Sequence, residues 1–411
     1  MIAALAAIVW VSLSAYSNYQ WSQAERSAKR GRWGQVRVHL GRFLAIHPTD
    51  AGARLLIAEA FLKDEANLTR DVATDAALRE LEQIADASSH GPRARIQEAR
   101  LRMFVLHQPR AAEERLRRAM ALDPHSGEAP YLLWKLYDLT GRSDWADDVF
   151  WKSYDATPVP NRADRLREWY MSQFFPAYAN PELDRLMGFL GEQDQPSLIS
   201  EFKRLQNFRE TEPDSPVALA AVAKWFHVEG DPKFALQLLT EAEPNLRAPY
   251  SEPFYVATLV SILIEMGEFE RAEAAFRRWP EPHAGYEFQK WQAIIFDEVR
   301  QEFEYALGAY GRALAEWPGT ADWRLQFRKA QCLARLGRSP EAEAQRNSAK
   351  SIEKLMDRDY QSGLRQALGQ LTDATQLKKM LAFYQELSCQ REVQAWSEVI
   401  RDLEPRPARS G

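Results

Sequence analysis

Hydrophobic positions along the chain recur with the spacing of helices. Over most of its length, apolar residues return every three or four positions. The runs between them are rich in Ala, Leu, Glu, Arg and Gln, which are good helix formers. Few stretches alternate with the two-residue period of a half-buried strand. The pattern therefore predicts a protein built almost entirely of helices.

Glycine and proline interrupt these helical stretches at a fixed distance. Gly31 precedes Pro48 by 17 residues, and Gly141 precedes Pro158 by the same 17. Pro124 and Pro158 lie 34 residues apart. Glycine adopts the left-handed conformation that ends a helix, whereas proline cannot continue a hydrogen-bonded turn. The spacing predicts a repeating unit of two helices, in which glycine ends the first and proline ends the second.

A helix–turn–helix unit of this length resembles the tetratricopeptide repeat. That family places small residues where the two helices of a unit approach most closely. Residues 161–215 show no clear signature, and Trp134 and Trp279 stand where the family has small residues. The best match, 287–320, has Ala293, Ala306, Tyr310, Ala313 and Pro318 at family positions. Weaker matches are 17–50, 93–126, 127–160, 216–249, 253–286, 323–356 and 374–407.

The resemblance implies an all-α fold, a right-handed α-solenoid of helix–turn–helix repeats preceded by a single apolar anchor helix. Because each helix pair is too small to bury its apolar side alone, we expect the pairs to stack into one continuous curved rod. The expected segments are an anchor or signal-like segment at 1–17, N-terminal repeats at 18–159, divergent helical repeats at 160–215, central repeats at 216–356, C-terminal helices at 357–405 and a disordered tail at 406–411.

The chain begins with an uncharged apolar run at residues 2–16. As a helix it would span about 22 Å, less than the ~30 Å hydrocarbon layer, but Tyr19 and Trp21 follow it as an interfacial aromatic belt would. We therefore predict a single-pass anchor in the cell membrane with the helical array exported, although the basic residues between Arg26 and Arg42 oppose that orientation. A cleaved signal peptide and a buried first helix are the alternatives.

Charge and motifs limit the chemistry. The net charge of −5 argues against nucleic-acid binding by overall charge. The sequence contains no GxSxG, HExxH or GxGxxG, and no two of its seven histidines stand at helical metal-binding spacing. We therefore expect no cofactor, no metal and no nucleic acid.

One acidic segment requires a separate interpretation. Asp144, Asp147 and Asp148 lie beside Trp145 and Trp151, as the acids of an α/α-barrel glycosidase could. The simpler interpretation is that Asp144 caps a helix while its neighbours face solvent. Likewise, the eight arginines within residues 93–118 are most simply a solvated helix face.

The candidate binding site is the concave side of the array, which the first helices of successive repeats would line. The residues expected there combine aromatic anchors with cations, a composition suited to a peptide or an acidic tail. They are Tyr131, Lys135, Lys224, His227, Trp291, Glu298, Arg324, Phe327 and Gln331.

These observations favour a non-enzymatic, membrane-tethered scaffold that binds peptide segments or partner proteins. For a tethered protein of this kind, the resemblance implies envelope assembly or quality control. The alternatives are an α/α-barrel carbohydrate-active enzyme and a soluble intracellular adaptor. A closed ring of helices around an acidic cavity would favour the enzyme, whereas the 34-residue spacing, which such toroids lack, favours the scaffold.

Overall fold

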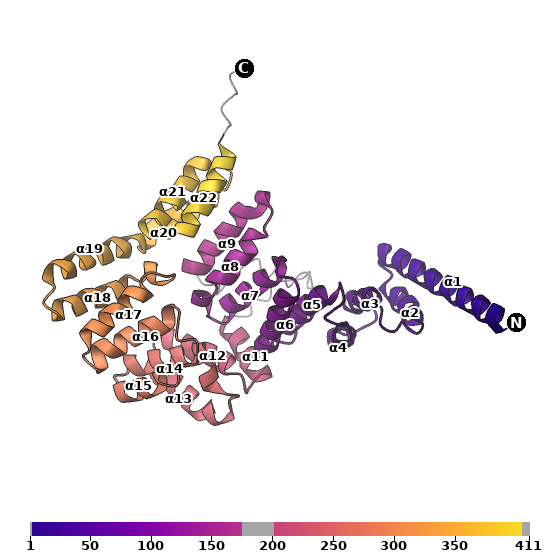
Figure 1. The fold of residues 1–411 in the computed structure, drawn as a ribbon, viewed down its shortest axis with the longest axis horizontal. Coiled ribbons are helices and arrows are strands. Elements are labelled where there is room, and N and C mark those ends of the chain that lie inside the picture. Colours follow the sequence, from indigo (N-terminus) through magenta and orange to yellow (C-terminus); the bar gives the residue numbers. More distant parts are fainter. Residues whose placement is uncertain (1, 175–200, 405–411) are drawn as a thin grey trace, which may run out of the picture. The chain divides into compact units, whose positions relative to one another are not determined.

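The computed structural model describes residues 2–174 and 201–404, and this part of the chain is helical without any β-strand. Figure 1 shows the helices following one another through short turns. Up to residue 211 they are α1 (Ile2–Lys29), α2 (Trp33–Leu44), α3 (Ala51–Lys63), α4 (Arg70–Glu82), α5 (Gly91–Phe104), α6 (Pro109–Leu122), α7 (Glu128–Leu139), α8 (Asp147–Asp155), α9 (Arg162–Phe174) and α11 (Glu201–Thr211).

The remaining helices begin after residue 215. They are α12 (Pro216–Val228), α13 (Pro232–Ala242), α14 (Pro253–Glu265), α15 (Phe269–Phe276), α16 (Tyr286–Ile294), α17 (Phe303–Ala313), α18 (Trp323–Arg335), α19 (Ser339–Leu355), α20 (Arg358–Leu368), α21 (Ala374–Glu386) and α22 (Gln390–Leu403). Two short 3₁₀ helices, η1 (Ser143–Trp145) and η6 (Gly319–Ala321), and a π-helical turn, η5 (Ile295–Val299), complete the elements used below.

The chain divides into two compact units. Unit 1 comprises Met1–Leu136 and Tyr178–Glu212, and unit 2 comprises Tyr137–Ala177 and Pro213–Gly411. Consecutive helices pack as pairs in both: α1 with α2, α3 with α4 and α5 with α6 in unit 1; α12 with α13, α14 with α15, α16 with α17, α18 with α19 and α21 with α22 in unit 2. Residues 175–200 of the predicted divergent segment, and the predicted tail at 406–411, lie outside the described residues.

The predicted glycine ends of the first helices are confirmed. At Gly337, φ is +74°, and the following amide, that of Arg338, donates to the carbonyl of Leu333 at 3.0 Å. This six-residue bond is the Schellman motif, which satisfies a carbonyl at the end of a helix. The other predicted glycines also have positive φ: Gly31, Gly141, Gly230 and Gly267.

Three helix pairs turn through a left-handed residue other than glycine. His107, Gln301 and Ser388 have φ of 55°, 58° and 58°. After Ser388, the amide of Cys389 donates to the carbonyl of Tyr384 at 3.0 Å, with the same spacing as in the glycine turns. After Gln301, the amide of Glu302 reaches one residue further back, to the carbonyl of Phe296 at 2.8 Å. A non-glycine residue in this conformation costs about 1–2 kcal/mol. Because these turns contain no glycine, their left-handed conformation leaves no signal in the sequence.

The predicted small residues are buried where the helices approach. Of the alanines at the family positions of the matching segments, Ala242 is half-buried. The others are at most 3% exposed: Ala24, Ala112, Ala119, Ala146, Ala223, Ala235, Ala272, Ala293, Ala306, Ala313, Ala330, Ala342 and Ala349. Trp134 and Trp279, which occupy family positions for small residues, are buried as well, at 0% and 5% exposure. At these two positions the core therefore holds an indole where the family has a small side chain.

The predicted membrane anchor is wrong. Within the described residues, no helix combines the length and the apolar character needed to cross a bilayer. The uncharged run at 2–16 is only the first half of α1, and Glu25 and Arg26 follow within the same helix. The second half of α1 packs against α2 through the fully buried Ala24, as the first helix of a repeat. The predicted location in the cell membrane depended on this anchor and is contradicted as well.

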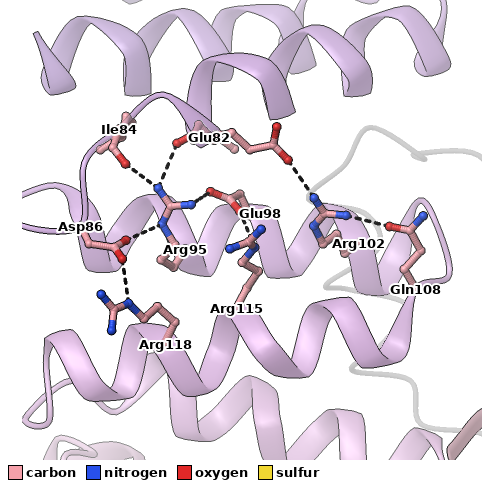
Figure 2. A network of polar contacts seen from close by, with 10 residues as sticks. Glu82, Ile84, Asp86, Arg95, Glu98, Arg102, Gln108, Arg115 and Arg118 are labelled. Atoms are coloured by element: carbon pink, nitrogen blue, oxygen red, sulfur yellow. Dashed lines mark hydrogen bonds and ion pairs between the residues drawn. The ribbon is translucent and has the colours of Figure 1, made fainter. Parts of the chain in front are cut away.

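Unit 1 contains a buried ion-pair network in the region that the sequence indicated as a solvated face (Figure 2). Glu98 is completely buried and pairs with Arg95 and with Arg115, whose Nε lies 2.9 Å from its carboxylate. Arg95 is 5% exposed and also pairs with Asp86 at 3.0 Å. Burial raises the pKa of Glu98, and the neighbouring arginines oppose that shift only in part. The arginine-rich segment is therefore partly a core element.

Unit 2 does not remain an open rod, contrary to the expectation. Figure 1 shows α9 beside α22, and direct hydrogen bonds join α9 to the last three helices. The indole Nε1 of Trp169 donates to Glu392 at 2.9 Å, and the hydroxyl of Tyr170 donates to Gln361 at 2.6 Å. Residues more than 190 positions apart in the chain thus meet, and unit 2 closes on itself.

Aromatic packing supports this closure. The rings of Phe150 and Trp169 stack with centroids 4.2 Å apart and planes 7° from parallel. The ring of Phe174 forms T-shaped pairs with the rings of Trp317 and Phe383, with centroids 5.4 and 5.1 Å apart. Aromatic pairs of this kind contribute about 0.5–1.5 kcal/mol each beyond their buried area. The cluster therefore fixes α8 and α9 against the C-terminal helices.

We predict that Glu98→Ala destabilises the α5–α6 pair by about 3–5 kcal/mol, because it leaves Arg95 buried without its main counter-charge. Hydrogen exchange of the α5 amides in the full chain measures the change. Glu59→Ala, which removes an exposed partner of Lys63, is the control and should cost under about 0.5 kcal/mol. Equal protection of α5 in both variants would contradict the role of the network.

We also predict that Gln301→Gly stabilises the α16–α17 pair by about 1 kcal/mol, because it removes left-handed strain. Gly337→Ala should destabilise α18–α19 by a similar amount. Gly363→Ala is the matched control: its backbone is helical with open space around it, so alanine there should stabilise α20. Thermal unfolding and local hydrogen exchange measure all three, and a loss of stability in Gln301→Gly would refute the strain argument.

Candidate functional site

A recess of about 740 Å³ lies within unit 2. Four segments line it: residues 144–148 around the start of α8, 284–288 at the start of α16, 315–320 after α17, and 388–392 at the start of α22. We call it the acidic recess. Because 144–148 and 388–392 belong to the elements that the closure joins, the recess depends on that closure.

A second recess, also of about 740 Å³, adjoins the first. The two share Asp144, Tyr286 and Trp317 in their walls. The second recess extends between α14, α16 and α18, and its wall carries both acids and bases. We call it the mixed recess. Together the two present a continuous, concave surface.

Two helix starts supply the acidic recess with carboxylates held by tryptophan. Asp147 lies in the first turn of α8 and accepts a hydrogen bond from Trp151 Nε1 at 3.0 Å. Glu287 lies in the first turn of α16 and accepts from Trp291 Nε1 at 2.8 Å. Each donor is four residues further along, one turn away on the same helix face. A helix N-terminus also stabilises an acid in its first turn.

Glu392 is the most deeply buried carboxylate of the wall. It lies in the first turn of α22 and is 4% exposed. One oxygen, Oε1, accepts from Trp169 Nε1 at 2.9 Å and from Gln173 Nε2 at 3.1 Å. Both donors belong to α9, so the side chain is part of the closing contact and of the recess wall at once.

Burial raises the pKa of the carboxyl groups of Asp147, Glu287 and Glu392. A hydrogen bond from an indole opposes the shift in each case. Arg391, 3.1 Å from Asp147, also lowers the pKa of that group, and the charges of Lys290 and Lys224 lower the pKa of Glu287. Nearby carboxylates add to it: Asp144 acts on Glu287, and Asp147 acts on Glu392. Ionising these carboxyl groups therefore costs free energy, and a bound cation would reduce that cost.

The acids that the sequence singled out lie mostly at this site, but not in the expected roles. Ala146, not Asp144, is the N-cap residue of α8, and Asp144 lies in η1, where it lines both recesses. Asp147 and Asp148 line the acidic recess with Trp145 instead of facing only solvent. The residues that sequence reasoning missed are Glu287, Glu316, Trp317 and Glu392.

Three of the predicted groove residues share the mixed recess: Trp291, Glu298 and Arg324 line its wall. Phe327 and Gln331 follow on α18; Phe327 contacts the ring of Trp323, and Gln331 is exposed.

The remaining four predicted residues lie elsewhere. Lys224 and His227 are on α12: Lys224 Nζ donates to the carbonyl of Gly141 at 2.7 Å, and His227 Nε2 lies 2.5 Å from Glu265, which is itself in the wall of the mixed recess. Tyr131 and Lys135 belong to α7 in unit 1, where Lys135 is 1% exposed and lies over the ring of Trp134.

Within residues 2–174 and 201–404, no three His, Cys, Asp or Glu side chains are grouped so that they could hold a metal ion. The carboxylates of the acidic recess are thus distributed around its wall.

No protein-family model and no curated protein matches the sequence. Several solved structures resemble the chain. The MamA protein aligns with 49% of this chain and 94% of its own, at 15% identity and a TM-score of 0.33. A tetratricopeptide repeat protein from Parabacteroides merdae covers 64% and 92%, at 14% identity and 0.32. The Cut9 and Hcn1 hetero-tetramer structure covers 97% of both chains, at 11% identity and 0.32. Because these scores are low, the assignment of helix-pair repeats depends on the caps and buried alanines of the chain itself.

We predict opposite effects for two substitutions of Glu392. Its raised pKa means that the folded state holds the proton more tightly than the unfolded state, so this contribution to stability is full at low pH and is lost as pH rises through the folded-state pKa. Glu392→Gln keeps an acceptor for Trp169 without the charge, so unit 2 should melt at a higher temperature than wild type at pH 8. The difference should shrink toward pH 4.

Glu392→Ala leaves the indole and amide donors of α9 unpaired and should cost about 1–3 kcal/mol for each. Calorimetry across pH measures both variants. A Gln variant that is less stable than wild type at every pH would show that the charge itself stabilises the closure.

Proposed function

We propose that this chain is a non-enzymatic protein-binding scaffold and that unit 2 receives a peptide segment of its partner in the two joined recesses. The observation that carries the proposal is the continuous concave surface, which helices from several successive repeats line within one unit. Proteins built of stacked helix pairs commonly bind their partners on concave surfaces of this kind.

The composition of the mixed recess supports this function. Trp291, Trp323 and Arg324 are side-chain types that anchor protein interfaces, and all three line the wall. Arg324 is exposed and lies over the ring of Trp323, 4.6 Å from its centroid. An exposed cation held on an aromatic ring is suited to the carbonyl or carboxylate groups of a peptide.

The convergence of carboxylates in a closed unit is also the feature named above for a carbohydrate-active enzyme. The repeat spacing, with its glycine and proline ends, favours the scaffold, because α/α toroids lack it. The buried acids also serve as acceptors for Trp151, Trp291 and Trp169, which gives them a role in packing.

We expect a displayed random-peptide library, selected on the full chain, to yield peptides that bind at the recesses. The double variant Trp323→Ala/Arg324→Ala should weaken a selected peptide about tenfold, because it removes an aromatic ring and a cation of α18 from the recess wall. Fluorescence anisotropy with the synthetic peptide measures the change.

Glu343→Ala/Lys350→Ala, at two exposed positions of α19, is the matched control and should leave binding unchanged. If no peptide is enriched, or if the α18 variant binds as well as the control, the recesses are not the binding surface. Release of sugar from glycans incubated with the chain would replace the scaffold with the enzyme.

A further inference from the structure

The wall of the acidic recess carries far more negative than positive charge. Its acids come from three helix starts and one turn: Asp144, Asp147, Asp148, Glu287, Glu316 and Glu392. Among the described residues that line it, Arg391 is the one cation, and it is paired with Asp147 at 3.1 Å. A concave wall with one sign of charge concentrates the field inside it. The recess therefore attracts a cation.

One buried polar atom of this wall is left without a partner from the described chain. The indole Nε1 of Trp317 is buried and has no acceptor among the described residues. Buried polar groups are almost always satisfied. Glu392, which lines the same wall, accepts the hydrogen bonds of Trp169 and Gln173 at Oε1. The wall thus offers carboxylates and one unsatisfied donor to an occupant.

Aromatic rings surround these polar atoms. Trp145, Tyr286, Phe288 and Trp317 line the recess together with the carboxylates. A ring face attracts a guanidinium or an ammonium group, and the apolar stem of an arginine or lysine packs against aromatic surface. A metal ion would use neither the rings nor the indole donor, whereas a peptide brings a cationic head, an apolar stem and backbone carbonyls.

We propose that the acidic recess binds an arginine or lysine side chain of the partner peptide, with Glu287 and Glu392 facing the cation and Trp317 Nε1 donating to a peptide carbonyl. This inference rests on the proposed function and narrows it to a basic partner segment. A volume of about 740 Å³ holds such a side chain together with the adjoining backbone. The partner chemistry is therefore the reverse of the acidic tail that the sequence suggested.

The test uses two capped, fluorescein-labelled hexapeptides, one alternating serine with arginine and one alternating serine with glutamate, titrated into the full chain. The arginine peptide should bind, and more weakly as salt is raised, because the attraction is electrostatic. The glutamate peptide should not bind. Glu287→Gln/Glu316→Gln, which keeps the shape of the wall and removes two charges, should weaken the arginine peptide about tenfold.

Glu343→Gln/Glu353→Gln is the control for net charge. It removes the same two charges at exposed positions of α19, away from the recess wall, and should bind the arginine peptide as wild type does. Melting temperatures equal to wild type show that both variants fold. Trp145→Leu, at a part-buried wall position, is a second test and should also weaken the arginine peptide.

The outcomes separate this inference from the proposed function. If the arginine peptide binds both double variants equally, or if the glutamate peptide binds as well, the basic-segment inference is overturned. If library peptides without basic residues bind and lose affinity in the α18 variant, the scaffold stands and only the inference fails. If a neutral oligosaccharide binds the acidic recess and the arginine peptide does not compete, the inference fails in favour of a glycan.

Discussion

The contact between α9 and α22 is the interaction on which the functional part of unit 2 depends. In an array of helix pairs, the repeat itself does not require distant pairs to meet, because each pair buries its apolar face against its neighbours alone. Here the indole N–H of Trp169 donates to Glu392 of α22, and the hydroxyl of Tyr170 donates to Gln361 of α20. That combination brings the start of α8 opposite the start of α22, and the acidic recess is the space between these and the start of α16.

Indole donors explain why the acids of the recess wall are tolerated. A carboxylate removed from water destabilises the fold unless strong donors replace the lost hydration. Asp147, Glu287 and Glu392 each receive an indole N–H, a donor carried on a large apolar body. Each of these tryptophans therefore buries apolar area and also donates a hydrogen bond to a carboxylate. The raised pKa values show that the compensation is incomplete, and the uncompensated part is what a cationic ligand would supply.

Unit 1 handles burial of charge differently. Around Glu98 the compensation is ionic, through Arg95 and Arg115, and the group is wholly buried. The carboxylates of unit 2 line open space and keep capacity for a ligand. One repeat architecture thus uses buried acids in two ways: as a structural network in unit 1 and as a candidate recognition surface in unit 2.

The sequence by itself determined what is local. Glycine at the end of a first helix, proline after a second and alanine at close approaches act within a few residues, so Gly141, Pro158 and Ala306 could be interpreted without coordinates. The two carboxylate–indole pairs at four-residue spacing, Asp147 with Trp151 and Glu287 with Trp291, were also readable in principle, because both partners share one helix face. The apolar run at 2–16 was misread, since the helix continues past it as a repeat helix.

Only the tertiary structure decided the rest. Glu392 is joined to Trp169 across 223 positions, and no periodicity in the sequence encodes a contact of that separation. The left-handed turns at Gln301 and Ser388 contain no glycine, so no local residue signal marks them. The closure of unit 2, and with it the sign of the charge that faces a partner, arises from side chains that are distant in the chain and meet only when the helices are stacked.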